Sequence, residues 1–285
     1  MATPIFVVQV ADRRLTFVEA NGNTSLADDN TNKLTLFCNR MAFGYTGLAS
    51  IGGRKTDVWL SYILSKFSGL SLNDAILEIK KEATAEFAKL THYSSKVKRH
   101  AFIGAGWACA SVKPLQFHPM MCRISNFHDD KGKVLASARS EFGFSYVVYE
   151  PPKWGWLETG TGMYPGEIAR LHRLLNRAAR RGASDVDAVR LMVSAIRNVS
   201  ARDKTVGKDL LAIMMPSTVA GADSVRVLTG DGTGMFIGDD LPSFKAPTIE
   251  SVFLPDGKAT GIIYAPNLAC NGTAILGMRA GPLSK

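Results

Sequence analysis

Strand-like and helix-like segments follow one another in blocks, and this order limits the possible folds of the chain more than any other feature. The pattern is a run of strands, two helices, a second run of strands, two more helices and further strands. Apolar residues at helical spacing place the helices at 57–70, 72–90, 165–181 and 184–200. Segregated runs of this kind are typical of α+β proteins, whereas α/β proteins alternate strand with helix. We therefore expect an α+β fold in which two stacked sheets are each covered by a helix pair.

Local sequence signals give the expected boundaries. Ser184 or Asp185 should cap the last helix, and residues 20–30 (ANGNTSLADDN) have the composition of a tight reversal. The Pro-Asp-Gly sequence at 255–257 indicates a hairpin. Strands are expected at 4–10, 33–38, 40–47, 100–110, 117–127, 131–149 and 209–215, and shorter ones near 224–229, 249–254, 260–265 and 273–278.

The composition is that of an ordinary globular protein. The 285 residues are 46% hydrophobic and 21% charged, which excludes disordered and collagen-like chains. The formal net charge of +9 allows a basic face but is well below a histone-like excess. No apolar run approaches the ~18 residues of a membrane span, and residues 1–14 lack the features of a signal peptide. The four cysteines are scattered without a CxxC pair, so we expect reduced thiols in a cytoplasmic protein.

Two motifs fail the spacing that their chemistry requires. Residues 47–56 (GLASIGGRKT) lie between a strand and a helix, but Gly53 stands where a phosphate-binding loop needs lysine. No common zinc spacing relates His118, Cys122 and His128. We therefore expect no metal ion and no organic cofactor.

Arginines recur every three or four residues along the expected helix at 165–181. They are Arg170, Arg173, Arg177, Arg180 and Arg181. Such a basic stripe can contact nucleic acid or an acidic partner. It can equally be a solvated helix face or a subunit contact, and no aromatic platform for stacked bases lies nearby. Nucleic acid is therefore not our expected partner, and a binding or scaffold module that uses this stripe is kept as an alternative function.

Four segments, taken in their order along the chain, resemble a known family. They are VVQVADRRLT (7–16), NKLTLFCNRMAFGYTG (32–47), LETGTGMYPGEIARL (157–171) and the helix, turn and strand over 184–215. Together they resemble proteasome β subunits and bacterial proteasome-like proteins, which belong to the N-terminal-nucleophile hydrolases. The resemblance covers about residues 5–215 and implies a four-layer αββα sandwich. We accordingly expect a proteasome-β-like domain at 1–216 and a β-rich extension at 217–285 packed on it.

The resemblance also implies a chemistry and a set of site residues. The family hydrolyses peptide or amide bonds with a Thr, Ser or Cys at the processed N-terminus, and the α-amino group of that residue acts as the base. A neighbouring lysine lowers the pKa of this amine by like-charge repulsion, and Lys33 matches that lysine. Asp12 matches the acid that pairs with the lysine. The remaining candidate catalytic residues implied by the resemblance are Arg14, Thr161, Asp203 and Thr205.

The N-terminal end departs from the family pattern. The nucleophile strand should form a hairpin with the strand that carries Asp12, which needs roughly 12–16 residues between nucleophile and acid. Thr3 precedes Asp12 by only 12 − 3 = 9 residues, and Ala2 has no nucleophilic group. As written, the chain is therefore expected to lack the nucleophile strand and to keep Asp12, Arg14 and Lys33 as an ion-pair network. The alternative is an active threonine-type peptidase or acyl transferase whose true N-terminus lies upstream.

Partners follow from the same resemblance. We expect a homo-oligomer, with a ring as one form, and a peptide or amide substrate if the protein is active. No membrane contact is expected, because no segment of the sequence is suited to cross one.

Overall fold

A computed structural model gives the fold of the chain. It describes residues 1–3, 6–18, 24–28, 31, 33–37, 41–67, 72–112, 115–150, 152–160, 163–208 and 210–216, together with the strands at 226–229, 249–253, 259–263 and 267–269. Over these residues the protein is mixed α+β, with helices in pairs and mainly antiparallel sheets, as the segment order predicts.

The larger sheet contains six strands. Their bounds are β4 Leu34–Phe37, β5 Met41–Thr46, β8 Ala101–Val112, β9 Leu115–Ser125, β10 Gly143–Val148 and β15 Asn267–Ala269. The strand order is β10-β9-β8-β5-β4-β15, and every neighbouring pair is antiparallel except the parallel pair of β15 and β4. The long β8–β9 hairpin confirms the paired strands expected at 100–110 and 117–127.

A smaller sheet has the order β1-β11-β12. Its strands are β1 Phe6–Asp12, β11 Leu210–Pro216 and β12 Arg226–Thr229, all antiparallel to their neighbours. Three further hairpins complete the β structure: β2 Leu15–Val18 with β3 Thr24–Asp28, β6 Ser50–Ile51 with β7 Arg54–Lys55, and β13 Ile249–Phe253 with β14 Ala259–Ile263.

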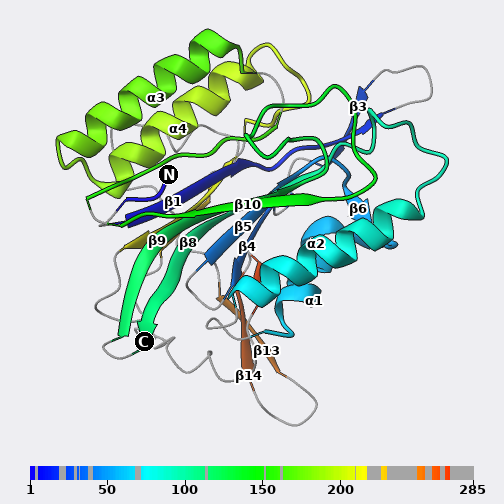
Figure 1. The fold of residues 1–285 in the computed structure, drawn as a ribbon, viewed down its shortest axis with the longest axis horizontal. Coiled ribbons are helices and arrows are strands. Elements are labelled where there is room, and N and C mark those ends of the chain that lie inside the picture. Colours follow the sequence, from blue (N-terminus) through cyan, green and yellow to red (C-terminus); the bar gives the residue numbers. More distant parts are fainter. Residues whose placement is uncertain are drawn as a thin grey trace.

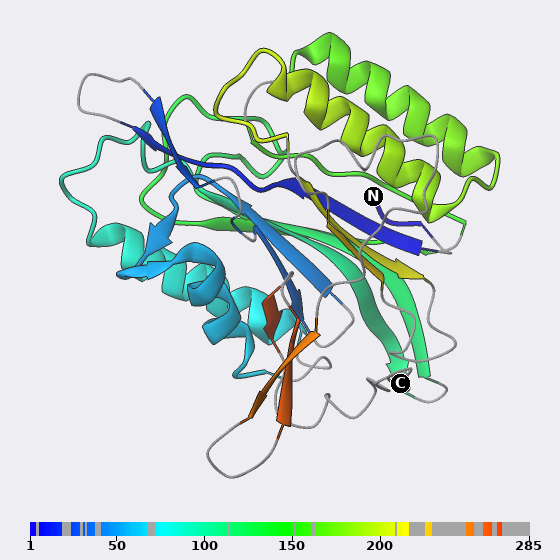
Figure 2. The ribbon, with the colours of Figure 1, turned by 180° about the vertical axis from the view of Figure 1, so that it is seen from behind.

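The helices form two pairs. They are α1 Thr56–Leu64, α2 Leu72–Ala88, α3 Pro165–Arg180 and α4 Asp185–Ser200. Figures 1 and 2 show α3 and α4 on one side of the strands and α1 and α2 on the other. The Ser184 hydroxyl accepts a hydrogen bond from the Asp187 amide, so of the two expected candidates Ser184 is the N-cap of α4.

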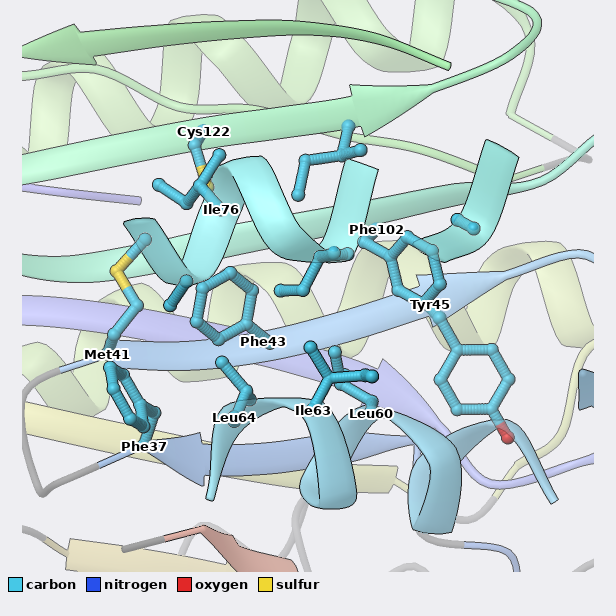
Figure 3. Close-up of a cluster of buried hydrophobic side chains, with 14 of the residues drawn as sticks. Phe37, Met41, Phe43, Tyr45, Leu60, Ile63, Leu64, Ile76, Phe102 and Cys122 are labelled. Carbon is cyan, nitrogen blue, oxygen red and sulfur yellow. The ribbon is translucent and has the colours of Figure 1, made fainter. Parts of the chain in front are cut away.

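Apolar residues gather in three clusters. The first joins α1 and α2 to the larger sheet, with Ile63, Ile76 and Phe102 among its buried members (Figure 3). The second contains residues of both sheets, including Trp107 of β8 and Ile213 of β11. The third joins the other face of the smaller sheet to the helix pair at 165–200.

Strand alternation explains how the smaller sheet serves two clusters at once. In β11, Leu211, Ile213 and Met215 belong to the cluster shared with the larger sheet. The intervening residues of the same strand, Leu210, Ala212 and Met214, belong to the cluster shared with α3 and α4. Successive side chains of a strand point to opposite faces, so a fully apolar strand can bury both of its faces.

Three local expectations are wrong. The helix expected at 57–70 ends at Leu64. Residues 24–28 form β3 instead of part of a tight reversal, because backbone pairing with β2 outweighs their polar composition. The strand expected at 131–149 is reduced to β10. The Asp129 carboxylate accepts hydrogen bonds from the Lys131 and Lys133 amides, which closes a local turn in place of a ladder.

Parts of the C-terminal region contribute backbone to both sheets. β12 extends the smaller sheet and β15 extends the larger one, while β13 and β14 flank the Pro-Asp-Gly sequence expected to form a hairpin. The strand expected at 273–278 lies outside the described residues. No helix within the described ranges is long and apolar enough to cross a membrane.

Candidate functional site

An ion pair joins the two sheets at one end of β1. Asp12 is the last residue of β1, and Lys33 immediately precedes β4 in the larger sheet. The Lys33 Nζ atom lies 2.9 Å from Asp12 Oδ1 and 3.1 Å from Oδ2. The two side chains are only 13% and 20% exposed. Two residues 21 positions apart in the sequence therefore form a charge pair that is largely shielded from water.

Backbone amides complete the surroundings of the Asp12 carboxylate. The Arg14 amide donates to Asp12 Oδ1 at 3.0 Å, and the Gly207 amide donates to the same oxygen at 3.2 Å. Together with the Lys33 ammonium, these donors give the partly buried carboxylate a charge partner and directed hydrogen bonds. A carboxylate removed from water needs such partners.

Gly207 is required by a close approach of two backbone segments. A Cβ atom at this position would lie 2.9 Å from Arg14 Cβ and 3.1 Å from the Arg14 nitrogen, so a side chain would push the segments apart. Without that approach the Gly207 amide could not reach Asp12. The role of Gly207 was not expected from the sequence; a glycine directly after the matched turn was the available signal.

The turn before Gly207 holds the remaining described candidates. Asp203 Oδ1 accepts hydrogen bonds from the Thr205 amide at 2.9 Å and from the Thr205 hydroxyl at 2.6 Å. The Arg14 guanidinium donates to the Lys204 carbonyl at 3.0 Å. Arg14 therefore ties the turn to the end of β1, and the Asp203 carboxylate is engaged in forming that turn.

Thr161 lies outside the described residues. Its neighbour Gly160 has a φ of +113° and comes close to the Thr46 hydroxyl, which would lie 3.7 Å from a Cβ at Gly160. Thr46 is the last residue of β5. Two residues earlier in this strand, Gly44 pairs with Leu34, which follows Lys33 directly in the sequence. The segment that leads to Thr161 thus approaches the end of the larger sheet where Lys33 lies.

Thr3 lies at the opposite end of β1 from the ion pair. Its hydroxyl donates to the Phe6 carbonyl at 2.8 Å and accepts from the Phe6 amide at 3.0 Å, and the residue is 3% exposed. From Phe6 to Asp12, β1 spans roughly 20 Å at the usual rise of a strand. The Thr3 hydroxyl is therefore locked in a turn far from the Lys33 ammonium.

The amino group of Met1 is buried near Thr3. It donates to the Val8 carbonyl at 2.8 Å, and burial lowers its pKa to about 5, an effect that the nearby Glu158 partly opposes. Met1 packs in the cluster beneath α3 and α4. This amine and the Lys33 ammonium therefore occupy different parts of the molecule.

The chemistry available at the ion pair follows from these contacts. Within the part of the chain that the structure describes, the hydrogen bonds of the Lys33 ammonium go to Asp12 alone. No described Thr, Ser or Cys side chain is hydrogen-bonded to it. The described residues therefore supply a fixed positive charge next to a satisfied carboxylate, without an attacking group.

A buried serine and histidine form a second polar contact, which sequence reasoning did not find. Ser125 Oγ lies 2.8 Å from His128 Nδ1, as a nucleophile and its base would. However, Ser125 Oγ also accepts from the Phe127 amide at 3.1 Å. Burial, followed by the charges of Arg123 and Arg99, lowers the pKa of His128 to about 4. A histidine with so low a pKa is a weak base, and the contact is typical of a buried turn.

The arginine stripe of α3 faces solvent. Every member of the stripe is exposed: Arg170, Arg173, Arg177, Arg180 and Arg181. Glu167 is the one acid in the helix, and it pairs with Arg202, whose Nη1 lies 2.7 Å from Glu167 Oε1. The positive charge of the stripe is therefore not neutralised by acids of its own helix.

Metal chemistry and known relatives give no further guide to function. Among the described residues, no group of three or more His, Cys, Asp or Glu side chains is arranged to hold a metal ion. Neither the comparison with protein-family models nor the comparison with curated proteins finds a match. The function has to be inferred from the contacts of the chain's own residues.

Proposed function

We propose that the chain is a proteasome-β-like protein of the N-terminal-nucleophile hydrolase class, with the αββα sandwich of that class. The order of the apolar clusters supports the four layers. One cluster joins α1 and α2 to the larger sheet, the next joins the two sheets, and the last joins the smaller sheet to α3 and α4. A helix pair on each outer face is the arrangement that such a sandwich requires.

The observation that carries the proposal is the contact of Lys33 with Asp12. The resemblance pairs Asp12 with Lys33, and although their strands belong to different sheets the two side chains lie 2.9 Å apart. The turn with Asp203 and Thr205 reaches the same place through Arg14 and Gly207. Residues that are distant in the sequence therefore meet in one cluster, which supports the proposal.

The role proposed for this cluster is structural. Asp12 and Lys33 fasten the end of the smaller sheet to the larger one, and Arg14 fastens the turn at 203–207. Hydrolysis by this class needs a side-chain nucleophile, its own free α-amino group, and a lysine that lowers the pKa of that amine. Thr3 is buried at the far end of β1, so it does not supply the first of these. We propose that the 285-residue chain does not cleave peptide or amide bonds.

The alternative within the same class is an active enzyme. A segment that precedes Met1 and begins with Thr, Ser or Cys could lie beside β1 and bring a nucleophile to Lys33. The protein would then be a threonine-type peptidase or an acyl transferase acting on a peptide or amide. For either version we propose a cytoplasmic location and a homo-oligomeric assembly, with a ring as one form.

A hydrolysis assay with fluorogenic peptide and amide substrates tests the proposal. The wild-type chain and Lys33→Ala should show the same background rate, because no acyl-enzyme can form. Lys81→Ala is the matched control, since Lys81 is 71% exposed and pairs only with Glu78 on the surface of α2. A rate above background that falls at least tenfold in Lys33→Ala, and not in Lys81→Ala, would support the active alternative instead.

A binding function is a second candidate, and the exposure of the α3 arginines favours it. Several cations on one helix face can hold a polyanion or an acidic protein surface. Changing Arg173, Arg177 and Arg180 to Gln should then lower the salt concentration at which the protein leaves a heparin column. Changing three exposed lysines, Lys81, Lys89 and Lys96, to Gln removes the same charge elsewhere. Equal losses in the two variants would mean that only the net charge matters and would remove this candidate.

A further inference from the structure

The outer edge of β10 is apolar and open. β10 is the last strand of the larger sheet, and within the described residues no strand pairs with its far side (Figure 1). Four of its six residues are large apolar side chains with high exposure: Phe144 at 40%, Tyr146 at 51%, Val147 at 51% and Val148 at 38%. An exposed, unpaired and apolar edge strand is a ready template for another strand, so soluble proteins usually cover it.

The hydrogen-bond register fixes which backbone groups point outward. The Tyr149 amide donates to the Pro119 carbonyl of β9 at 2.8 Å, directly after the paired strand residues Val148 and Met120. In an antiparallel pair, alternate residues face the partner strand. Val147 and Ser145 therefore also face β9, whereas the amides and carbonyls of Phe144, Tyr146 and Val148 point to the open edge.

The side chains of these outward-directed residues share one face. The Phe144 and Tyr146 rings are stacked, with centroids 6.3 Å apart and planes within 8° of parallel. Lys80 of α2 lies over the Phe144 ring, with Nζ 5.6 Å from the centroid. Val147 is exposed on the opposite face. Both faces of β10 thus carry exposed apolar side chains.

We propose that a second copy of this chain pairs with β10 in antiparallel fashion, with Tyr146 opposite Tyr146 of the other copy. A twofold axis through this pair sets Phe144 opposite Val148 and Val148 opposite Phe144. Every outward amide and carbonyl of Phe144, Tyr146 and Val148 then meets its complement. The larger sheets of the two copies become one continuous sheet, and the apolar side chains on both faces of β10 become covered.

Flanking charges favour a second copy over an unrelated strand. Antiparallel pairing brings the start of one β10 against the end of the other. Lys80 lies beside the start of the strand, and the exposed Glu150 follows its end. In the twofold register Phe144 stands opposite Val148, so Lys80 of one copy and Glu150 of the other lie at the same end of the interface. A parallel pairing would instead set Lys80 beside Lys80 and Glu150 beside Glu150.

Sedimentation and cysteine crosslinking test the interface and its register. The wild-type chain should be a dimer at micromolar concentration. Tyr146→Glu should weaken it at least tenfold, because two carboxylates would face each other across the twofold axis. Tyr93→Glu is the matched control: Tyr93 is 42% exposed outside β10, and its replacement should leave dimerisation unchanged.

Crosslinking distinguishes this pairing from other dimers. Directly opposite residues of an antiparallel pair have Cα atoms about 5 Å apart, which suits a disulfide. Tyr146→Cys should therefore give a covalent dimer on mild oxidation, beyond any formed by the wild-type cysteines. Val147→Cys should give much less, because its two copies are diagonal neighbours about 7–8 Å apart. A monomeric wild-type chain, a dimer indifferent to Tyr146→Glu, or equal crosslinking by the two cysteine variants would overturn the proposal.

Discussion

Two polar groups inside the molecule are accommodated in opposite ways. Asp12 and Lys33 lie against each other as opposite charges, and two backbone amides donate further hydrogen bonds to the Asp12 carboxylate. His100 is fully buried among aromatic rings, including Phe87 and Phe102 with centroids 5.3 and 4.7 Å from its own. Among the described residues no counter-charge accompanies it, and burial lowers its pKa to about 3. The imidazole is therefore kept neutral.

The contrast shows what each region does for the fold. The His100 ring acts as an apolar side chain with one acceptor, since its Nδ1 receives the Leu48 amide at 3.0 Å. The Asp12–Lys33 pair acts as a link between two sheets and is partly reached by water. Acid should therefore lower the free energy of unfolding mainly through His100. Removing the charge of Asp12 or Lys33 should lower it by breaking the link between the two sheets.

The largest expected effect is a loss of stability in acid that depends on His100. Its pKa is lowered on folding, so the unfolded chain takes up a proton below pH 6.5 while the folded chain does not until about pH 3. This difference has no effect on stability above pH 6.5. Below it, the free energy of unfolding falls by about 1.4 kcal/mol per pH unit, a total loss of about 3 kcal/mol at pH 4. Urea unfolding from pH 7 to pH 4 measures this loss.

His100→Phe isolates that contribution. The variant keeps a ring in the aromatic cluster, but the Leu48 amide loses its acceptor, which costs about 1–3 kcal/mol at pH 7. Its stability should fall less steeply in acid, so the two curves approach each other near pH 4. The exposed His92 provides the control, since His92→Phe should follow the wild-type curve. A constant gap between wild type and His100→Phe would contradict a neutral buried imidazole.

The next largest effect concerns the charged pair. Asp12→Ala should destabilise the protein by about 2–3 kcal/mol, because it leaves the shielded Lys33 ammonium without a counter-charge. Adding Lys33→Ala should recover part of this loss, giving a coupling energy of about 1–2 kcal/mol in a double-mutant cycle. The pair of Glu78 and Lys81 is the comparison: its lysine is 71% exposed, and the expected coupling is below about 0.5 kcal/mol. Equal coupling in the two cycles would mean that the sheet link contributes no more than a surface pair.

The smallest effect concerns the turn beside the pair. Gly207→Ala should cost about 1–2 kcal/mol, since the added Cβ would meet Arg14 at 2.9 Å and draw the Gly207 amide away from Asp12. Gly166 is a suitable control because a Cβ there meets nothing within 4 Å. Thermal unfolding of both variants measures the difference. If Gly207→Ala unfolds at the same temperature as the wild type, the close approach is not needed for stability.

Periodicity predicted much of the fold because it reports local burial. The apolar run at 209–215 could be assigned to a strand, and the cap of the last helix to Ser184 or Asp185, from neighbouring residues alone. The strand at 24–28 was missed because its polar residues owe their conformation to pairing with 15–18. Pairings such as β15 with β4 depend on contacts across more than two hundred residues, which no local pattern reports.

The candidate site was harder to predict from the sequence than the fold. The contact of Lys33 with Asp12 was expected only through the family resemblance, because nothing in their spacing brings two strands of different sheets together. The contributions of the Gly207 amide and the Lys204 carbonyl were missed, because every residue carries a backbone carbonyl, and nearly every one an amide, so residue type does not show which of them form contacts. The exposed apolar edge of β10 was missed as well, since its alternation resembles that of a covered strand.

Covalent labelling tests most directly whether the Asp12–Lys33 cluster acts without a nucleophile. The chain that begins at Met1 is incubated with an epoxyketone or a β-lactone, both of which react with catalytic N-terminal threonines, and is then analysed by intact-mass and peptide mass spectrometry. We predict no adduct on Thr3, because its hydroxyl is engaged with Phe6 at the far end of β1 from Lys33. An adduct on Thr3 that is abolished by Lys33→Ala but retained in Lys81→Ala would contradict this prediction and show a working hydrolase.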